Sequence, residues 1–312
     1  MKQYLPELAC PFCARRSPFI RYQITEQHRI VKCEDCGLMW LHPRPSLEEL
    51  HEIYDEGYYH NEEFYDSAGS KLYGYYDYLY ERLNKQYTYQ KMADRADELL
   101  RRDRHHDQEK PAWLDVGCGL GFLMDVAFDH GYRVHGVEFN PYAVQAIEAK
   151  YTFPVTCGSI HDLDPGERYQ VISLFDVIEH LDDPFGDLKL LRNLVSDDGL
   201  LMLQTMDSES LPSRIIGKRL EDFRRFREHL YFFSRQSMTR VLEAAGWEVV
   251  DIVSVGHTFQ LEMLLDRVAL YTPRLVKVLK FLIWPKWLLA ANIYVNPHTK
   301  MMVYARPRAG GQ

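Results

Sequence analysis

The chain has 312 residues, 46% of them apolar, and a formal net charge of −8 at pH 7. This length accommodates one large domain with an appendage, or two domains. The negative charge argues against a protein that holds nucleic acid mainly by neutralising its phosphates.

Targeting and membrane-spanning segments are not expected. The first ten residues contain no apolar block of the kind found in a secretory signal. The longest apolar stretch, 281–295, is interrupted by Pro285 and Lys286 and falls short of a membrane span. We therefore predict a cytoplasmic protein in which the six cysteines are thiols or metal ligands and not disulfides.

Four cysteines near the start of the chain form two pairs with metal-ligand spacing. The pairs read Cys-Pro-Phe-Cys and Cys-Glu-Asp-Cys, with nineteen residues between them. A two-residue gap lets both thiolates of a tight turn reach one ion, and two such turns complete a tetrahedral shell of four sulfurs. The sequence therefore predicts one structural zinc ion bound by Cys10, Cys13, Cys33 and Cys36.

The surrounding sequence suggests how this metal site is built into the chain. Residues 19–31 alternate enough to form a short hairpin, so we expect a zinc ribbon over residues 1–45. Its last apolar strip, Leu38–Leu41, must pack on another part of the protein. Residues 46–110 are rich in tyrosine and are predicted to form a helical linker or cap, with an amphipathic helix at 90–102.

An apolar strand beginning at Trp113 leads into a loop with glycines at 117, 119 and 121. A dinucleotide-binding loop would have its third glycine one residue later, where Phe122 stands, and a phosphate-cradling loop would add a lysine. The loop therefore suits close approach of the backbone to an uncharged ligand. The next strand, 134–138, ends in Glu138, whose carboxylate is placed to accept hydrogen bonds from ribose hydroxyls.

Strands and helices continue to alternate towards the C-terminus. Further strands are predicted at 169–175, 200–206, 247–255 and 300–306, with a helix at 237–245. This alternation predicts an α/β fold with a mostly parallel, doubly wound sheet that binds ligands at the carboxyl ends of its strands.

Residues 112–255 resemble a class I S-adenosylmethionine-dependent methyltransferase of the small-molecule type 11/12 kind. The matching motifs are Leu-Asp-Val-Gly-Cys-Gly-Leu-Gly from residue 114, Gly-Val-Glu from 136 and Phe-Asp-Val-Ile-Glu-His-Leu from 175. The resemblance implies a Rossmann-like sheet of seven strands over residues 111–312, with S-adenosylmethionine as methyl donor. It assigns these positions to the donor: Asp115, Gly117, Cys118, Gly119, Gly121, Glu138, Phe139, Ser159, Ile160 and Phe175.

Within this set the resemblance implies particular roles. Glu138 is expected to hold the ribose, and Phe139 to pack on the adenine ring. Ser159 stands where the family often has an aspartate near the adenine amine, and Ile160 can offer its backbone to the same group. Asn140-Pro-Tyr is similar to part of the motif of nucleic-acid amino-methyltransferases, but it follows the second strand and not the fourth. It is more simply a helix start, with Asn140 capping.

The cysteine pairs ahead of this domain are similar to those of zinc-bearing sugar methyltransferases and of methyltransferases encoded with surface-glycan genes. The resemblance implies a small-molecule acceptor, for which a sugar or nucleotide-sugar hydroxyl in glycan or secondary-metabolite biosynthesis is the leading expectation. Three alternatives stay open: a quinone-type O-methyltransferase, an RNA methyltransferase, and a non-enzymatic RNA-binding protein that uses the ribbon. The net charge and the missing amino-methylation motif disfavour both nucleic-acid alternatives.

Asp176, Glu179 and His180 form a further constellation. Their spacing could place three ligand atoms on one face, and similar residues are proposed metal ligands in quinone-pathway O-methyltransferases. The same Glu-His-Leu occurs across the wider superfamily where no metal is expected. We therefore prefer a structural role for this motif and keep a second metal site as the alternative.

Two segments are longer than the plain fold requires, 207–233 and 256–299, and both leave from the carboxyl ends of strands. They are therefore expected to cover the substrate. The first is rich in cations, which suits a phosphate or carboxylate on the acceptor as well as a merely solvated face. The second contains a basic, amphipathic stretch at 275–291. This stretch suits the inner face of a membrane, a lipid-linked substrate, or a homodimer contact.

The first of these segments also contains the candidate catalytic pair, Glu228 and His229. Methyl transfer to a hydroxyl requires a positioned acceptor and removal of its proton, which suits an imidazole with a pKa near neutrality. The zinc-bearing sugar methyltransferases have a similar Glu-His followed by an aromatic pair and serine, with the histidine as base, although Phe226 replaces their tyrosine. We expect His229 to act as base with Glu228 orienting it. The alternative is a histidine that satisfies a buried carbonyl.

Overall fold

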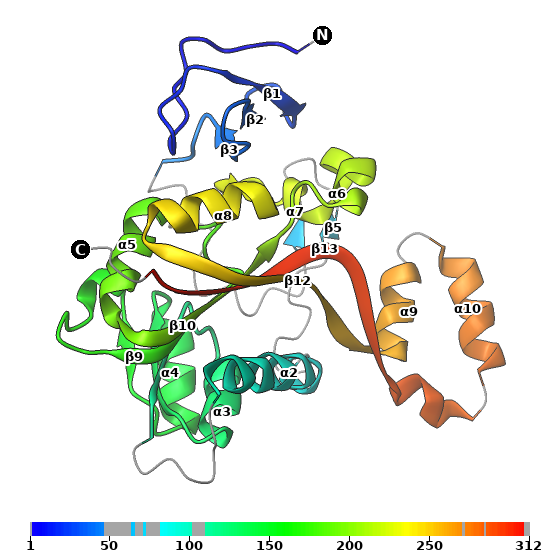
Figure 1. The fold of residues 1–312 in the computed structure, drawn as a ribbon. Helices are drawn as coiled ribbons and strands as arrows, with labels where there is room; N and C mark the ends of the chain where they lie inside the picture. Colours follow the sequence, from blue (N-terminus) through cyan, green and yellow to red (C-terminus); the bar gives the residue numbers. More distant parts are fainter. Residues whose placement is uncertain are drawn as a thin grey trace.

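The computed structural model describes residues 2–46, 64–65, 71–72, 82–101, 110–269, 272–283 and 285–308. Its main feature is a seven-stranded sheet (Figure 1). In spatial order the strands are β12 (Trp247–Gln260), β13 (Asn292–Pro307), β10 (Val195–Met206), β9 (Tyr169–Phe175), β6 (Ala112–Val116), β7 (Arg133–Glu138) and β8 (Val155–Cys157). β13 is antiparallel to both of its neighbours, and the other pairings are parallel. The predicted α/β, doubly wound and mostly parallel sheet is confirmed.

Helices cover both faces of this sheet (Figure 1). One face carries α2 (Arg82–Leu100), α3 (Phe122–Asp129) and α4 (Pro141–Lys150), and the other carries α5 (Pro184–Leu194) and α8 (Arg235–Ala244). Successive strand residues therefore enter different cores. Trp113 packs with α2 and α3, whereas Leu114 packs with α5 and α8. Burial on both faces explains why these strands are apolar throughout and do not alternate with polar residues.

Several helix starts follow from local sequence. The side chain of Asn140 accepts a hydrogen bond from the amide of Tyr142, and Pro141 occupies the first turn of α4, which confirms the predicted cap. At α8, Ser234 and Ser237 form a reciprocal capping box. Gly121 begins α3 with a φ of 78°, a left-handed conformation that glycine adopts without a Cβ penalty.

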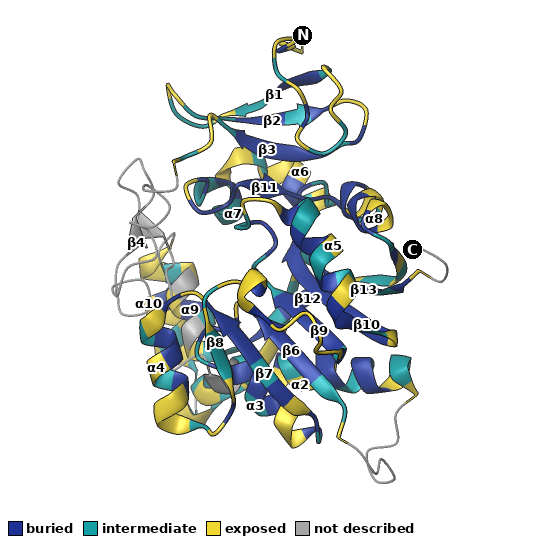
Figure 2. Cartoon of the chain, turned by 90° about the vertical axis from the view of Figure 1, so that its left-hand side faces the viewer, coloured by how far each residue is buried: buried dark blue, intermediate teal, exposed yellow. Residues whose placement is uncertain are grey.

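The N-terminal segment forms a second, four-stranded sheet (Figure 2). Its own strands are β1 (Pro18–Gln23), β2 (Arg29–Cys33) and β3 (Met39–His42), joined antiparallel as the hairpin prediction required. The fourth strand, β11 (Tyr231–Phe232), comes from the other end of the chain and pairs with β3. This pairing identifies what the apolar strip 38–41 packs against, since all four of its residues are buried.

Three features differ from the sequence-based expectation. Residues 46–110 were expected to be helical, but they include the strands β4 (Phe64–Tyr65) and β5 (Lys71–Leu72), which form an antiparallel hairpin. Most of the tyrosine cluster and the loop 102–109 lie outside the described residues. α2 begins earlier than the helix predicted at 90–102, and β10 begins earlier than the strand predicted at 200–206, with a register shift against β9 between Val195 and Leu200.

β12 and β13 are also longer than predicted, because they continue beyond the sheet as a two-stranded ribbon. His257–Gln260 pair with Asn292–Val295 after a register shift at Gly256. Gly256 is the residue after the predicted strand 247–255. A Cβ at this position would lie 2.1 Å from the carbonyl oxygen of Val295, so the close approach of the two backbones requires glycine here.

The segments between the strands complete the described fold. Segment 207–233 contains α6 (Leu211–Ile216), η3 (Gly217–Arg219), α7 (Glu221–Arg224) and β11. Segment 256–299 contains α9 (Leu261–Ala269), α10 (Pro273–Leu282) and η4 (Lys286–Ala290), while η2 (Ile160–Asp162) follows β8. None of the described helices is long and apolar enough to cross a membrane.

Candidate functional site

The glycine loop joins the end of β6 to α3 and is tied to the end of β7. The amides of Gly117 and Cys118 both donate to the carbonyl oxygen of Val137, at 2.8 and 3.1 Å. Gly117 has a φ of 67°, and a Cβ there would lie 2.5 Å from a methyl group of Val177. The loop therefore needs glycine both for its conformation and for its closeness to the loop that follows β9.

Glu138 is the buried carboxylate at the end of β7. Its two oxygens accept hydrogen bonds from the amides of Gly119 and Asn140, at 2.8 and 2.9 Å. Each carboxylate oxygen has a second lone pair, so these bonds orient the group and leave acceptor capacity for hydroxyl donors. The carboxylate therefore anchors the glycine loop, and its contact with a ribose stays a prediction.

Asp115 lies beneath this loop, on the strand itself. Its carboxylate accepts a hydrogen bond from the Ser173 hydroxyl at 2.6 Å. Burial raises the pKa of Asp115 to about 7, since the Ser173 hydrogen bond offsets the desolvation only in part and the Glu138 charge adds to it. Asp115 is therefore placed mainly to hold β6 and β9 together below the ligand-binding loop.

The other residues that were expected to bind the donor differ in how far their side chains are buried. The Cys118 side chain packs into the apolar core, in a space left by Gly136, where a Cβ would lie 2.7 Å from the sulfur. Only the backbone of Cys118 is thus available to a ligand. Phe139, 45% exposed, follows β7 and presents a ring that can cover an adenine. Phe175, at the end of β9, lies 5.6 Å from the ring of Tyr89.

Ser159 and Ile160 follow β8. The Ser159 hydroxyl donates to Asp162 at 3.1 Å in a capping box that starts η2, and Ile160 is buried. The hydroxyl is therefore committed to the local turn. Asp162 supplies the carboxylate that the Ser159 position lacks, but its Oδ2 also accepts from the Ser159 amide at 2.8 Å.

A partly buried charged cluster lies at the carboxyl ends of β9 and β10, beside Lys300 of the antiparallel strand β13. Asp176 has a φ of 56°, which is strained for a residue other than glycine and is typical of functional sites. Its carboxylate contacts the ammonium of Lys300 at 2.7 Å and the amide of Gln204 at 3.1 Å. Burial disfavours the ionised carboxyl most strongly, but the charge and hydrogen bond of Lys300, together with the His257 and Lys85 charges, outweigh it and lower the pKa of Asp176. The sequence analysis missed Lys300 and Gln204.

Glu179, His180 and His229 lie together beside this ion pair. One ligand-type atom from each is within 4.8 Å of the other two, and the two imidazole rings are 4.7 Å apart at 84°. Among the described atoms, Glu179 Oε2 and His229 Nδ1 are buried without a hydrogen-bond partner. Buried polar atoms are normally paired, so this concentration indicates a place for a ligand. In the metal site kept as the alternative to a structural role, Asp176 was the third member; its carboxylate instead contacts Lys300, and His229 lies beside Glu179 and His180.

Backbone carbonyls fix the two imidazoles. His180 Nδ1 donates to the carbonyl of Glu228 at 3.0 Å, which directs its Nε2 to the cluster. The backbone of Asp222 favours the charged form of the His229 ring, and His229 Nδ1 has no hydrogen-bond partner among the described atoms. Glu228 was expected to orient His229; instead its carboxylate lies 3.7 Å from the Arg225 guanidinium.

Burial also sets the protonation of this cluster. Desolvation, with the nearby Arg225, lowers the pKa of His180 to about 4. The pKa of His229 is lowered well below its usual value by burial and then by His180 and Arg225. The expectation of an imidazole with a pKa near neutrality is therefore wrong for His229, which is neutral at pH 7. Burial and the Asp176 charge raise the pKa of Glu179 to about 8.

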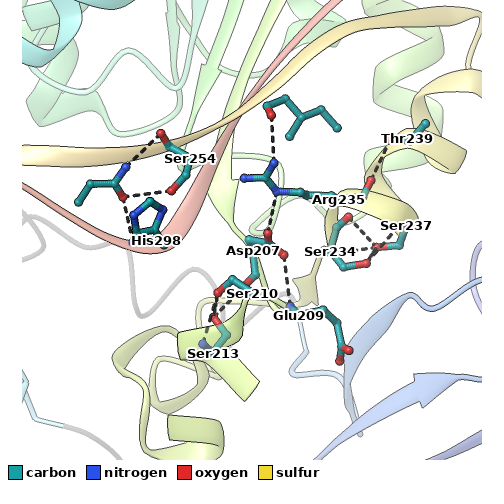
Figure 3. Close-up of polar contacts among 12 residues, drawn as sticks. Asp207, Glu209, Ser210, Ser213, Ser234, Arg235, Ser237, Thr239, Ser254 and His298 are labelled. Atoms are coloured by element: carbon teal, nitrogen blue, oxygen red, sulfur yellow. Dashed lines mark hydrogen bonds and ion pairs between the residues drawn. The ribbon is translucent and has the colours of Figure 1, made fainter. Parts of the chain in front are cut away.

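Segment 207–233 is held over the carboxyl edge by polar contacts at its two ends (Figure 3). Asp207, after β10, accepts from the Arg235 guanidinium at 3.0 Å, and Arg235 also donates to the Ile252 carbonyl of β12. Its cations do not form one patch. The exposed ones are Arg214, Lys218, Arg219 and Arg227. Arg225 is half-buried near His180 and His229, so it is the cation best placed to act on an acceptor.

The four N-terminal cysteines converge as predicted. The sulfurs of Cys10 and Cys36 are 3.5 Å apart, those of Cys13 and Cys33 are 3.6 Å apart, and all four lie within 4.8 Å of one another. A tetrahedral zinc site with Zn–S bonds of about 2.3 Å places its sulfurs roughly 3.8 Å apart. The donor set and its dimensions therefore fit zinc.

A separate hollow lies at the opposite, amino edge of the sheet. It has a volume of about 500 Å³ and is bordered by residues that include Phe128, Arg133, His135 and Tyr169. His135 and Tyr169 are hydrogen-bonded to each other across it at 2.8 Å. Parallel sheets of this class bind ligands at the carboxyl edge, so we do not assign the donor to this hollow.

Known proteins share this arrangement. A family model described as "Methyltransferase domain" matches residues 84–252, which is more than half of the chain. A probable S-adenosylmethionine-dependent methyltransferase of Mycolicibacterium smegmatis is 28% identical over 146 residues, covering 46% of this chain and 54% of that protein. A ubiquinone biosynthesis O-methyltransferase of Bradyrhizobium diazoefficiens is 26% identical over 99 residues, covering 30% of this chain and 39% of that protein.

These matches span about half or less of the length of the relatives. Among solved structures, a Burkholderia thailandensis 1,6-didemethyltoxoflavin-N1-methyltransferase with bound S-adenosylhomocysteine is similar over 92% of this chain and 98% of that chain, at 13% identity and a TM-score of 0.50. At this identity the likeness shows the fold alone.

Replacing Glu179 with glutamine is predicted to stabilise the protein at alkaline pH. The pKa of Glu179 is raised from 4.5 to about 8 in the folded state, so its ionisation penalises only that state. The free energy of unfolding of the wild type should therefore fall as the pH rises from about 4.5 to about 8. We expect Glu179→Gln to gain roughly 1–3 kcal/mol at pH 9 and almost nothing near pH 5, measured by urea unfolding.

The matched control is Glu148→Gln, which changes an exposed carboxylate on α4 and should alter neither value. A Glu179→Gln effect of the same size at both pH values would show that packing, and not buried ionisation, distinguishes the variant.

Proposed function

The chain belongs to the class I S-adenosylmethionine-dependent methyltransferases, and from that premise we propose that it methylates a hydroxyl group of a small-molecule acceptor. The observation that carries the proposal is the polar cluster at the carboxyl ends of β9 and β10, beside Lys300 of β13. It contains a neutral imidazole nitrogen and a carboxylate oxygen, both buried without a hydrogen-bond partner among the described atoms. Such a site suits one polar acceptor group better than an apolar one.

For the donor, we propose that Glu138 binds the ribose and Phe139 covers the adenine. The glycine loop from Gly117 to Gly121 would follow the methionine part with its backbone. The support is geometric, because these residues stand at the carboxyl ends of the adjacent strands β6 and β7. The sulfonium methyl would then face the strands next to them, β9 and β10, where the cluster lies.

His229 is the residue that we propose as base. Methyl transfer forms a carbon–oxygen bond as the carbon–sulfur bond breaks, and the acceptor oxygen becomes positively charged unless its proton leaves. The hydroxyl proton would pass to His229 Nδ1, which has no hydrogen-bond partner among the described atoms. A weak base suffices here because the hydroxyl becomes strongly acidic as the methyl group arrives. The neighbouring Glu179 carboxyl can then share the charge on the imidazolium.

A sugar or nucleotide-sugar hydroxyl is the acceptor that we propose first. Its support is the resemblance of the cysteine ribbon and of the Glu228–Ser234 segment to sugar methyltransferases. Arg225 beside the cluster would suit a phosphate or carboxylate on such an acceptor.

A quinol or catechol hydroxyl is the second candidate, favoured by one specific observation. Glu179, His180 and His229 offer a carboxylate and two imidazoles within 4.8 Å, a donor set that suits a divalent metal ion. The contacts of the two histidines with backbone groups resemble the hydrogen bonds to carbonyl oxygens that orient metal-binding histidines. Incubating the protein and labelled donor with nucleotide sugars and with quinol precursors, each with and without added Mg²⁺ or Zn²⁺, discriminates the two. Labelled quinol formed only with added metal would favour this candidate over the first.

Alanine at position 229 should remove turnover and leave donor binding intact. We expect His229→Ala to lose about 10²–10⁴-fold in kcat, the usual worth of a general base, with the affinity for S-adenosylhomocysteine unchanged. Labelled methyl transfer gives kcat and calorimetry gives the affinity. His298→Ala, which changes an exposed histidine of β13, is the control. A His229→Ala protein that melts early but keeps its turnover would make this histidine a structural residue.

The ribose contact predicts a separate effect on donor affinity. Glu138→Ala should weaken binding of S-adenosylhomocysteine by about 1.5–3 kcal/mol, because charge-assisted hydrogen bonds to two hydroxyls are lost. Calorimetry measures this difference, with Glu148→Ala on α4 as control. NAD should not bind to the wild type. Unchanged affinity in Glu138→Ala would place the ribose on another residue.

We also propose that the cysteine cluster binds one structural zinc ion, and that residues 1–45 form the ribbon, 46–110 a linker and 111–312 the methyltransferase domain. Four thiolates leave no open position on zinc for a substrate or water. Elemental analysis of the purified protein should find one zinc per chain. Cys36→Ser should lower the zinc content and Tm, whereas Cys157→Ser, which changes an exposed cysteine outside the cluster, should change neither. Full Tm in zinc-free protein would contradict a structural role.

A further inference from the structure

The segment between β12 and β13 forms an arm beside the main sheet. Here the arm means residues 261–291, with α9, α10 and η4. It is carried by the two-stranded extension in which His257–Gln260 pair with Asn292–Val295. Figure 1 shows α9 and α10 side by side and projecting away from the sheet, in orange. Little of the arm is therefore available to the two cores of the main domain.

The apolar stripe of α10 faces outwards. Leu275, Val278, Leu279 and Leu282 recur at helical spacing, and three of them are more than half exposed. The opposite side of the helix carries Val276, which is 2% exposed, and Lys280, which binds Glu262 and Asp266 of α9 at 3.3 and 2.8 Å. This amphipathicity is the reverse of the usual one, since the helix turns an ion pair inwards and its leucines outwards.

Two large aromatic side chains extend this surface. Phe281, near the end of α10, is 82% exposed, and Trp287 of η4 is 69% exposed. Side chains of this size are seldom left in water without a partner, whereas phenylalanine and tryptophan are favoured at the boundary between lipid headgroups and acyl chains.

The charge of the arm indicates what kind of partner it binds. The chain has a net charge of −8, yet it contains no aspartate or glutamate from Arg267 to its last residue. Arg274, Lys277 and Lys286 are exposed on the arm beside the apolar stripe. A symmetric contact between two copies through this face would bring these cations towards one another, which costs energy. An anionic lipid surface complements both the cations and the apolar side chains.

We propose that the arm binds reversibly to the surface of a bilayer that contains anionic phospholipid, with the stripe of α10, Phe281 and Trp287 at the level of the headgroups. The arm lies on the surface and does not cross, in keeping with the length of its helices. β13 begins at Asn292, directly after the arm, and leads to Lys300, which contacts Asp176 in the polar cluster. Lys300 is eight residues beyond Asn292, or about 25 Å of extended chain. Binding would therefore hold the mouth of the site near the membrane surface.

Vesicle co-sedimentation tests this inference without any methyl transfer. The full-length protein is mixed with vesicles of phosphatidylcholine alone and of phosphatidylcholine with phosphatidylglycerol. We expect binding to the anionic vesicles that weakens with added salt. Two double variants test the side chains of the arm: Phe281→Ser with Trp287→Ser, and Lys277→Gln with Lys286→Gln. We expect each to bind the anionic vesicles with an affinity roughly tenfold lower than that of the wild type, or lower still.

Phe128→Ser is the matched control, because it removes an exposed phenylalanine of α3, outside the arm. Each variant should keep the wild-type Tm and affinity for S-adenosylhomocysteine, so a loss of binding cannot come from unfolding. Equal binding by the wild type and both arm variants, or no binding by the wild type, would overturn the proposal. So would a wild-type dimer that the arm variants convert to a monomer, since the occupant of the face would then be a second copy.

Discussion

A short backbone ladder fixes the cluster of Glu179, His180 and His229, on which the proposed function depends. Leu230 and Tyr231 donate their amides to the carbonyl of Glu179, while the Leu230 carbonyl accepts from the amide of Leu41 in β3. The segment that carries His229 is thus held between the N-terminal ribbon and the loop after β9. Because backbone bonds and not flexible side chains set these distances, the imidazole of His229 and the carboxyl of Glu179 are positioned before any ligand arrives.

This arrangement gives the N-terminal ribbon a physical role. Its third strand completes a sheet with β11, which joins the segment that contains the cysteine cluster to the segment that carries His229. Side chains reinforce the contact, as Arg240 of α8 donates to the Asp35 carbonyl and Arg44 binds Asp182. In the proposed function the N-terminal sheet is a scaffold, and the chemistry takes place at the carboxyl edge of the main sheet.

Much of the cluster is buried, and this affects both stability and chemistry. Burial keeps the two histidines neutral and favours the protonated form of Glu179, which a stable core would avoid. The ion pair of Lys300 with Asp176 is the compensating element, since each charge favours the other inside the protein. Residues that destabilise the fold when unliganded are typical of sites built for a ligand.

The sequence was sufficient where function depends on neighbours along the chain. The glycine loop, Glu138, the Asn140 cap and the paired cysteines are local patterns with local physical reasons. It was insufficient where residues meet across the fold. His180 and His229 are 49 positions apart, Lys300 comes from the last strand, and no spacing relates them. The motif predicted that Cys118 lines the ligand. Only its backbone is available there, because the absence of a side chain at Gly136 leaves a space in the core that the Cys118 sulfur fills.

The central claim is that the donor methyl group faces the cluster of Glu179 and His229. A crystal structure with bound S-adenosylhomocysteine tests it most directly. The account predicts the ribose on Glu138 and the sulfur directed at His229 Nδ1, with room for a methyl group and one acceptor oxygen about 3 Å from that nitrogen. A sulfur that points away from the cluster, or a wall of side chains between the two, would contradict it.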